Sequence, residues 1–376
     1  MHNKCTVVFI LPSMETGGVS KMLIATLNSL DKSKYDVDIL YLEKEGELLK
    51  DIPKWVNLLS VEGYKYIKMI FLLLKNLYHK FGNLLVRKNK KIKVKNYNVG
   101  IAFQDGMATW FTAKNIHAQY KFAVIHTDFK EAKYNVDNEE KVYNVFEKIY
   151  CTSNSAKESF LSCMPRFKDR TKVWIPNIDK QNLLKMVDCC TEVPPKTDRV
   201  RLVTVARLSH EKGIDKAIKA LSQLVKEGYN IEWYFIGDGP DRKKLEKVVN
   251  KLECYSNAIF LGNVQNPYGF IFSSDIYVQP SNYESYCIAL AEARALGCAI
   301  VTSDFPSAKE QLQDNAGLIT GTTWESLYEG IKIMLDNLEI RQNFSVTCEE
   351  SFEKRNINCN ILISDLDSYC KDIGDV

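Results

Sequence analysis

One stretch of the chain, residues 201–236, reads RLVTVARLSHEKGIDKAIKALSQLVKEGYNIEWYFI. Residues 201–206 are a short apolar run typical of a buried strand, and residues 214–226 repeat apolar side chains at helical spacing. Residues 233–236 are a second apolar run. Strand, helix and strand in this order predict a parallel βαβ unit. The same alternation continues to residue 302, so the second half of the chain is predicted to be a parallel sheet flanked by helices.

The first half of the chain opens in a similar way. Residues 5–11 read as a strand, Gly17 and Gly18 lie in a polar loop, and a helix and a second strand follow. A polar linker with a Pro-Pro pair separates the halves near residues 190–198. We therefore predict one α/β domain over residues 1–190, a second over residues 191–350, and a terminal helix over residues 351–376 that packs back on the first domain. Ligands of such sheets bind in crevices at the carboxyl ends of the strands.

Composition narrows the classes of protein that the chain can belong to. The 376 residues are 45% hydrophobic and 26% charged, which indicates a globular protein, and a net charge of +3 gives no general affinity for nucleic acid. Eleven cysteines include no C-x-x-C pair, so we expect reduced thiols and no zinc site. The sequence shows no signal peptide, and the apolar run at residues 69–74 is far shorter than a membrane span of ~20 residues. We expect a cytoplasmic protein.

One segment of the chain is strongly basic, although the chain as a whole is close to neutral. Residues 63–104 contain ten Lys or Arg and no Asp or Glu, and residues 65–95 have helical periodicity with an apolar stripe. Such a helix either packs on the first domain with its lysines in water, or lies on an anionic membrane face. In the second case the protein is peripheral on the inner face of the cell membrane.

Two glutamates follow the strand that ends near residue 279. Glu284 lies in the loop at its carboxyl end, and Glu292 lies in a helix predicted from about residue 286. The free N–H groups and positive dipole end of that helix suit a phosphate. Two carboxylates on either side of a diphosphate would suit the hydroxyls of a sugar and a ribose. The spacing alone fits equally a helix with two surface glutamates.

Three further features lie at predicted strand ends. Arg207 and Lys212 could neutralise a diphosphate, the role that a metal plays in other enzymes. Gly17 and Gly18 permit close approach of backbone to a ligand, but they do not form the G-x-G-x-x-G of dinucleotide sites. His126 follows the strand at residues 122–125. Each feature alone has an ordinary structural explanation, as a solvated loop, a turn or a structural histidine.

The order of these motifs closely resembles the GT-B-fold retaining glycosyltransferases of family 4, most strongly over residues 203–318. The resemblance implies two Rossmann-like domains facing across a cleft. It implies that Arg207, Lys212, Gly18 and the backbone of Ser285, Tyr286 and Cys287 hold the donor diphosphate. Glu292 would bind the ribose, Val264 would lie along the base, and Glu284 and His126 would be at the reacting sugar. Enzymes of this kind retain anomeric configuration, need no metal or other cofactor, and use a nucleotide-sugar donor.

The predicted function is transfer of a sugar from a UDP-sugar to a saccharide acceptor in bacterial surface polysaccharide synthesis. If the basic helix lies on the membrane, we expect that acceptor to be a lipid-linked saccharide. This chain reads Glu-Ser-Tyr-Cys at residues 284–287, where the family often reads Glu-Gly-Phe-Gly, and this difference leaves the sugar open. Alternatives are a catalytically silent partner of another transferase, or a nucleotide-sugar epimerase. A metal-dependent transferase would need Asp-x-Asp at a strand end, whereas residues 36–38 open a strand and residues 365–367 lie in the terminal helix.

Overall fold

The computed structural model describes residues 4–14, 17–42, 46–60, 95–175, 177–354 and 360–371. Residues 65–94 of the predicted basic helix lie outside these ranges. The chain forms two compact units. The first comprises Met1–Asn177 with Asn358–Val376, and the second comprises Ile178–Ile357. The boundary predicted at residue 190 lies beyond α7 (Lys180–Asp188), which in the structure belongs to the second unit and packs against its helix α10 (Tyr268–Phe272).

The first unit is built on a seven-stranded sheet in the order β3-β2-β1-β4-β5-β6-β7, and every neighbouring pair is parallel. The strands are β1 (Cys5–Leu11), β2 (Tyr35–Tyr41), β3 (Asn57–Ser60), β4 (Tyr97–Ala102), β5 (Ala118–Ile125), β6 (Lys148–Cys151) and β7 (Thr171–Val173). The order reverses between β1 and β4. Ligands of open α/β sheets ordinarily bind at the carboxyl ends of the strands where the order reverses in this way.

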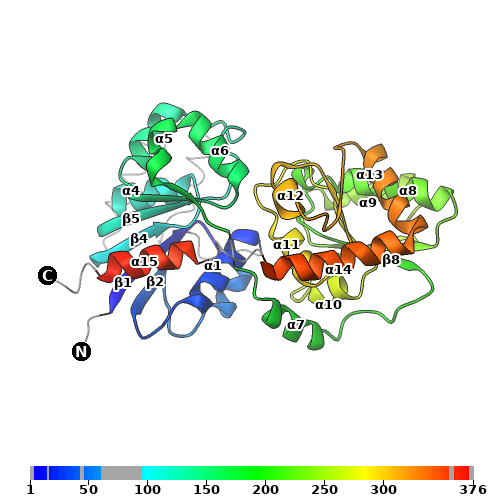
Figure 1. Cartoon of the computed structure of the whole chain (residues 1–376), viewed down its shortest axis with the longest axis horizontal. Coiled ribbons are helices and arrows are strands. Elements are labelled where there is room, and N and C mark those ends of the chain that lie inside the picture. The colour runs from blue at the N-terminus through cyan, green and yellow to red at the C-terminus, as the bar shows by residue number, and fades with distance from the viewer. Residues whose placement is uncertain are drawn as a thin grey trace. The chain divides into compact units, whose positions relative to one another are not determined.

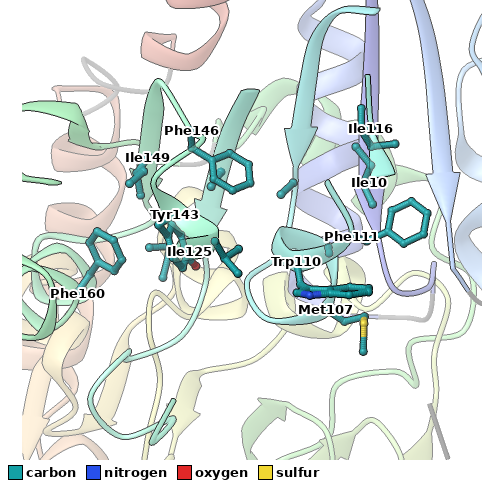
Figure 2. Close-up of a cluster of buried hydrophobic side chains, with 14 of the residues drawn as sticks. Ile10, Met107, Trp110, Phe111, Ile116, Ile125, Tyr143, Phe146, Ile149 and Phe160 are labelled. Carbon is teal, nitrogen blue, oxygen red and sulfur yellow. The ribbon is translucent and has the colours of Figure 1, made fainter. Parts of the chain in front are cut away.

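Helices cover both faces of this sheet (Figure 1). One face carries α4 (Met107–Asn115), α5 (Val136–Tyr143) and α6 (Asn154–Cys163), and the other carries α1 (Gly18–Ser29) and α15 (Ile361–Lys371). Figure 2 shows part of the core beneath the first group, where Trp110 and Phe111 of α4 and Tyr143 of α5 are fully covered. Strands buried on both faces read as near-continuous apolar runs, which is why β1 was recognisable in the sequence.

The terminal helix α15 is held by the first unit. Asp365 pairs with Lys172 Nζ at 2.8 Å and accepts a hydrogen bond from Tyr150 at 2.7 Å. A disulfide joins Cys370 to Cys5 at the start of β1. The prediction of reduced thiols is therefore wrong for this pair, because the fold brings together two cysteines 365 residues apart in the sequence. Among the described residues the other eight cysteines are free.

The second unit has a six-stranded parallel sheet in the order β10-β9-β8-β11-β12-β13. Its strands are β8 (Val200–Val205), β9 (Ile231–Ile236), β10 (Ala258–Gly262), β11 (Ile276–Gln279), β12 (Ile300–Ser303) and β13 (Leu318–Thr320). Numbered from β8, this is the 3-2-1-4-5-6 order of dinucleotide-binding folds. The predicted parallel sheet is confirmed, and its order reverses between β8 and β11.

Two layers of helices enclose this second sheet (Figure 1). One contains α8 (Ile214–Lys226), α9 (Arg242–Lys251) and α13 (Trp324–Asp336); the other contains α7, α10, α11 (Ile288–Ala295), α12 (Pro306–Gln311) and α14 (Leu338–Lys354). Side chains of β11 alternate between the layers, with Ile276 and Val278 toward the first and Tyr277 toward the second. No helix within the described ranges has the length and apolar character that crossing a membrane requires.

Candidate functional site

Two loops meet where the order of the second sheet reverses. One follows β8 and the other follows β11, and Asn282 of the second loop donates from its backbone N–H to the carbonyl of Glu211, at 2.9 Å. Gly213 makes this approach possible. A Cβ at residue 213 would lie 2.1 Å from the carbonyl oxygen of Pro280, and the backbone there has φ +62°. Only glycine fits both conditions without strain.

Lys212 and Glu284 form an ion pair across these loops. Lys212 Nζ lies 2.7 Å from Glu284 Oε1, and Ser281 Oγ donates to the same oxygen at 2.9 Å. Burial would lower the pKa of Lys212, but the Glu284 carboxylate raises it above its ordinary value overall. Lys212 is therefore a fixed positive charge at neutral pH. It retains 23% exposure of its side chain, so a ligand can reach it.

Arg207 supplies a second positive charge near Lys212. Its side chain is exposed just beyond β8. Burial would raise the pKa of Glu211, but a hydrogen bond from Ser209 and the charges of Arg207 and Lys212 lower it overall. Both cations therefore act on one small region at the carboxyl end of β8. An anionic ligand bound there would be attracted by both.

The start of α11 completes this region of the second unit. The helix begins at Ile288, two residues later than predicted, and Cys287 precedes it in a left-handed conformation with φ +66°. The carbonyl of Tyr286 accepts hydrogen bonds from Gln311 Nε2 and, at 3.1 Å, from Ser307 Oγ. Both donors belong to α12, so this helix anchors the loop that precedes α11. The first N–H groups of a helix have no partner inside the helix and suit an anion.

Glu292 lies one turn further along α11 and is 3% exposed. Tyr268 of α10 donates a hydrogen bond to Glu292 Oε1 at 2.7 Å, which fixes the carboxylate. Val264, two residues beyond β10, is half-buried against the cluster that contains Tyr268. The sequence gives no sign of the role of Tyr268, because contact between α10 and α11 depends on the tertiary fold.

His126 occupies the corresponding edge of the first sheet, beyond β5. Its Nε2 lies 2.9 Å from the carbonyl oxygen of Phe103, so this nitrogen carries the proton and Nδ1 is the acceptor of the neutral ring. Burial lowers the pKa of His126 to about 4, although the Asp105 charge opposes the shift. The imidazole is therefore neutral at pH 7.

Asp105, which follows β4, anchors the loop that contains His126. It accepts hydrogen bonds from the His126 backbone N–H at 3.0 Å, from the Thr127 hydroxyl at 2.7 Å and from the Tyr134 hydroxyl at 2.9 Å. Sequence reasoning missed Asp105. An acidic residue soon after the apolar run that forms β4 was a usable signal. Gly18 is exposed at the first residue of α1, in the same unit.

The structure thus brings together most of the predicted residues of the second half. The residues at the β8 and β11 ends are Arg207, Lys212, Glu284, Ser285, Tyr286 and Cys287, with Glu292 and Val264 on the adjoining elements. His126 and Gly18 lie in the first unit. Asp36 and Asp38, considered for a metal, are engaged by Lys95 at 3.1 and 3.2 Å. Over the described ranges, no group of three His, Cys, Asp or Glu is arranged to hold a metal.

Known proteins resemble the chain in sequence and in structure. Residues 191–349 match the family described as glycosyl transferases group 1. Protein CapJ of Staphylococcus aureus is 40% identical over 96 residues, which are 25% of this chain and 24% of CapJ. The N-acetylgalactosamine-N,N'-diacetylbacillosaminyl-diphospho-undecaprenol 4-alpha-N-acetylgalactosaminyltransferase of Campylobacter jejuni is 26% identical over 159 residues, 41% of this chain and 43% of that protein. The matched segments thus span about a quarter to two fifths of these relatives.

The likeness in structure extends over nearly the whole chain. HepE of Anabaena, in complex with UDP and glucose, superposes with a TM-score of 0.73 at 16% identity, over 96% of this chain and 99% of HepE. At this level of identity the likeness establishes the fold. Together with the two parallel sheets and their flanking helices, it confirms the predicted α/β fold of the GT-B class.

Proposed function

We propose that the protein transfers a sugar from a nucleotide-diphosphate donor to a saccharide acceptor, a premise that the match of residues 191–349 to the glycosyl transferases group 1 family supports. The observation that carries the proposal is the Lys212–Glu284 pair beside Arg207 at the reversal of the second sheet. A diphosphate needs positive charge, and a sugar needs hydrogen-bond acceptors for its hydroxyls. This edge of the sheet supplies both within a few ångströms.

The donor diphosphate would be held by Arg207, Lys212 and the backbone of residues 285–287, and the resemblance to family 4 adds Gly18. The two side chains and the start of α11 would stabilise the negative charge that develops on the leaving diphosphate. In this proposal they do so without a metal or another cofactor. Because Lys212 already pairs with Glu284, the bound diphosphate would share this cation with the carboxylate.

Glu292 would accept hydrogen bonds from the ribose hydroxyls, and Tyr268 would hold the carboxylate in place through the 2.7 Å hydrogen bond. Val264 would lie along the base. This half-buried apolar side chain suits the face of an aromatic ring.

Glu284 would contact the transferred sugar, and His126 is the second residue that the resemblance to family 4 assigns to the reacting sugar. A neutral ring with Nδ1 as acceptor can take a hydrogen bond from a sugar hydroxyl, which a protonated ring cannot. We propose that the transfer retains anomeric configuration, as the resemblance to family 4 implies.

Similarity to named proteins supports the proposed substrates and setting. HepE was solved with UDP and glucose, which favours a UDP-sugar donor. The Campylobacter jejuni relative is named for an undecaprenol-linked acceptor, which favours a lipid-linked saccharide. We propose that the protein acts in bacterial surface polysaccharide synthesis, and that it does so in the cytoplasm, peripheral on the inner face of the membrane. Anionic lipid would bind the basic residues of segment 65–95.

A donor-hydrolysis screen tests this proposal. The protein is incubated with UDP-glucose, UDP-galactose, UDP-N-acetylglucosamine and GDP-mannose in the presence of a chelator, and the released nucleotide is measured. We expect release from one UDP-sugar, and loss of that release in Glu284→Ala and Arg207→Ala. Lys219→Ala, an exposed cation on α8 away from the two loops, is the matched control and should keep full activity.

The product of that reaction tests the stereochemistry. With an acceptor saccharide present, NMR of the product should show the anomeric configuration of the donor. Activity that requires a divalent metal would contradict the metal-free proposal. Absence of both turnover and UDP binding would contradict transfer altogether and favour a catalytically silent partner protein.

A further inference from the structure

Strand β11 carries two polar side chains at positions where a buried parallel strand ordinarily carries apolar ones. Tyr277 and Gln279 point to the face covered by α11, and they are 0% and 1% exposed. Burying such groups costs free energy unless each forms hydrogen bonds. Their neighbours on the opposite face, Ile276 and Val278, are apolar as expected. The polar pair therefore requires a specific explanation.

The two side chains form a continuous series of hydrogen bonds that ends at Glu284. The Tyr277 hydroxyl lies 2.6 Å from Gln279 Oε1. Gln279 Nε2 lies 2.9 Å from Ser281 Oγ, and Ser281 Oγ lies 2.9 Å from Glu284 Oε1. Ser281 is also fully buried. Residues two apart on a strand share a face, which is how Tyr277 and Gln279 meet along the strand.

The chemistry of the last group fixes the direction of all three hydrogen bonds. An ionised carboxylate only accepts hydrogen bonds, so Ser281 must donate to Glu284. The Ser281 oxygen then accepts from the amide nitrogen of Gln279, and the amide oxygen accepts from Tyr277. Every donor therefore points toward the carboxylate, and hydrogen bonds aligned in this way strengthen one another.

We propose that Tyr277 and Gln279 are positioning residues that act through Ser281 to hold Glu284 as an oriented anion for sugar transfer. This inference rests on the proposed function. The diphosphate and nucleoside contacts use Arg207, Lys212 and Glu292, none of which belongs to the series. Loss of Tyr277 or Gln279 should therefore affect turnover while leaving nucleotide binding intact.

A second buried hydrogen-bond series provides a matched control. Trp233 Nε1 donates to Thr204 Oγ1 at 3.0 Å, and Thr204 Oγ1 donates to the carbonyl of Val278 at 2.7 Å. It is buried beside the same strand but ends on the backbone. Thr204→Val and Tyr277→Phe each remove one buried hydroxyl. The first leaves Trp233 Nε1 and the Val278 carbonyl without this partner, and the second leaves Gln279 Oε1 without it. Only Tyr277→Phe disturbs the series that reaches Glu284.

The experiment measures kcat and KM for the UDP-sugar that the wild type hydrolyses, and the Kd of UDP. Tyr277→Phe should lower kcat about 5-fold and Gln279→Met about 10-fold or more, which is the scale of one hydrogen bond in each case. KM and the UDP Kd should stay within about 2-fold. Thr204→Val should keep the wild-type kcat. Because Tyr277 acts only through Gln279, the double variant should be no slower than Gln279→Met.

Three outcomes would overturn the inference: a wild-type kcat in Tyr277→Phe, an equal fall of kcat in Thr204→Val, or additive losses in the double variant. If Tyr277→Phe does not fold, by circular dichroism, Gln279→Met is compared with Thr204→Val by the same criteria. A wild type that neither turns over nor binds UDP overturns the proposed function and this inference together. An active wild type with unaffected variants overturns this inference alone.

Discussion

At the scale of single residues, the positive charge of Lys212 is central to the proposed donor site. Replacing it with Met removes one charged contact to the diphosphate, and such contacts contribute about 1.5–3 kcal/mol. We expect Lys212→Met to weaken UDP binding at least about 10-fold in titration calorimetry. Lys219→Met changes a lysine on the exposed side of α8 and should leave the Kd unchanged. Equal affinities in the two variants would place the diphosphate elsewhere.

His126 makes stability depend on pH. Its pKa is lowered by burial from 6.5 to about 4, so the unfolded chain binds a proton at a higher pH than the folded chain does. The neutral imidazole of His126 therefore contributes up to about 3 kcal/mol to the free energy of unfolding. This contribution is complete above pH 6.5 and is lost as the pH falls toward 4.

Chemical denaturation at pH 7 and pH 4.5 measures this effect of His126. The wild type should lose more stability between the two values than His126→Gln, since glutamine does not titrate. The remaining titratable groups are the same in both proteins, so the difference between the two losses of stability is due to His126. An identical loss in both proteins would show that the imidazole is not held neutral.

At the scale of elements, Gly213 determines how closely the loop after β8 approaches the loop after β11. Alanine at residue 213 would have to adopt a left-handed backbone conformation, which costs about 1–2 kcal/mol, and its Cβ would clash with the Pro280 carbonyl. Gly228, beyond α8, has φ +86° and open space around it, so Gly228→Ala carries the strain alone.

Comparison of these two glycine variants isolates the clash. We expect Gly213→Ala to be the less stable by at least about 1 kcal/mol in urea unfolding, the usual cost of forcing extra atoms into a packed site. It should also bind UDP more weakly than Gly228→Ala does. Similar stability and affinity in the two variants would mean that the contact between the loops is unimportant.

The attachment of α15 to the first unit is a second feature at this scale. The Cys5–Cys370 disulfide adds a covalent link to the ion pair and hydrogen bonds that already hold the helix. Closing so long a loop stabilises a protein by about 2–4 kcal/mol in most cases. Reductant should therefore lower the thermal midpoint of the wild type and have no effect on Cys370→Ser. Peptide mapping of the oxidised protein should recover the linked pair.

At the scale of the whole molecule, ligand binding should stabilise selected segments. UDP at 100 times its Kd stabilises a protein by about 2.7 kcal/mol. Hydrogen exchange on the full chain should show the strongest protection in residues 206–213 and 284–292 of the second unit. Amides of α15 should exchange at the same rate with and without UDP. Protection spread evenly over both units would contradict a nucleotide site in the second unit.

Much of the fold was predictable because buried parallel strands leave a strong signal. The strand at residues 5–11 and the helix at residues 214–226 match the structure at both ends. Short edge strands were missed: β3 is largely exposed and β13 has only three residues, so neither has a distinctive apolar run.

By itself, the sequence determined the α/β class, the two halves, and the clustering of charged residues at strand ends, because these depend on periodicity and on motifs local in the chain. Tertiary structure alone decided which groups meet. Tyr268 reaches Glu292, Asp105 anchors His126, and the polar face of β11 ends at Glu284. Cys5 and Cys370 likewise meet only in the fold. Such contacts join residues from different elements, whose distance is set by strand order and helix packing and leaves no periodic trace in the sequence.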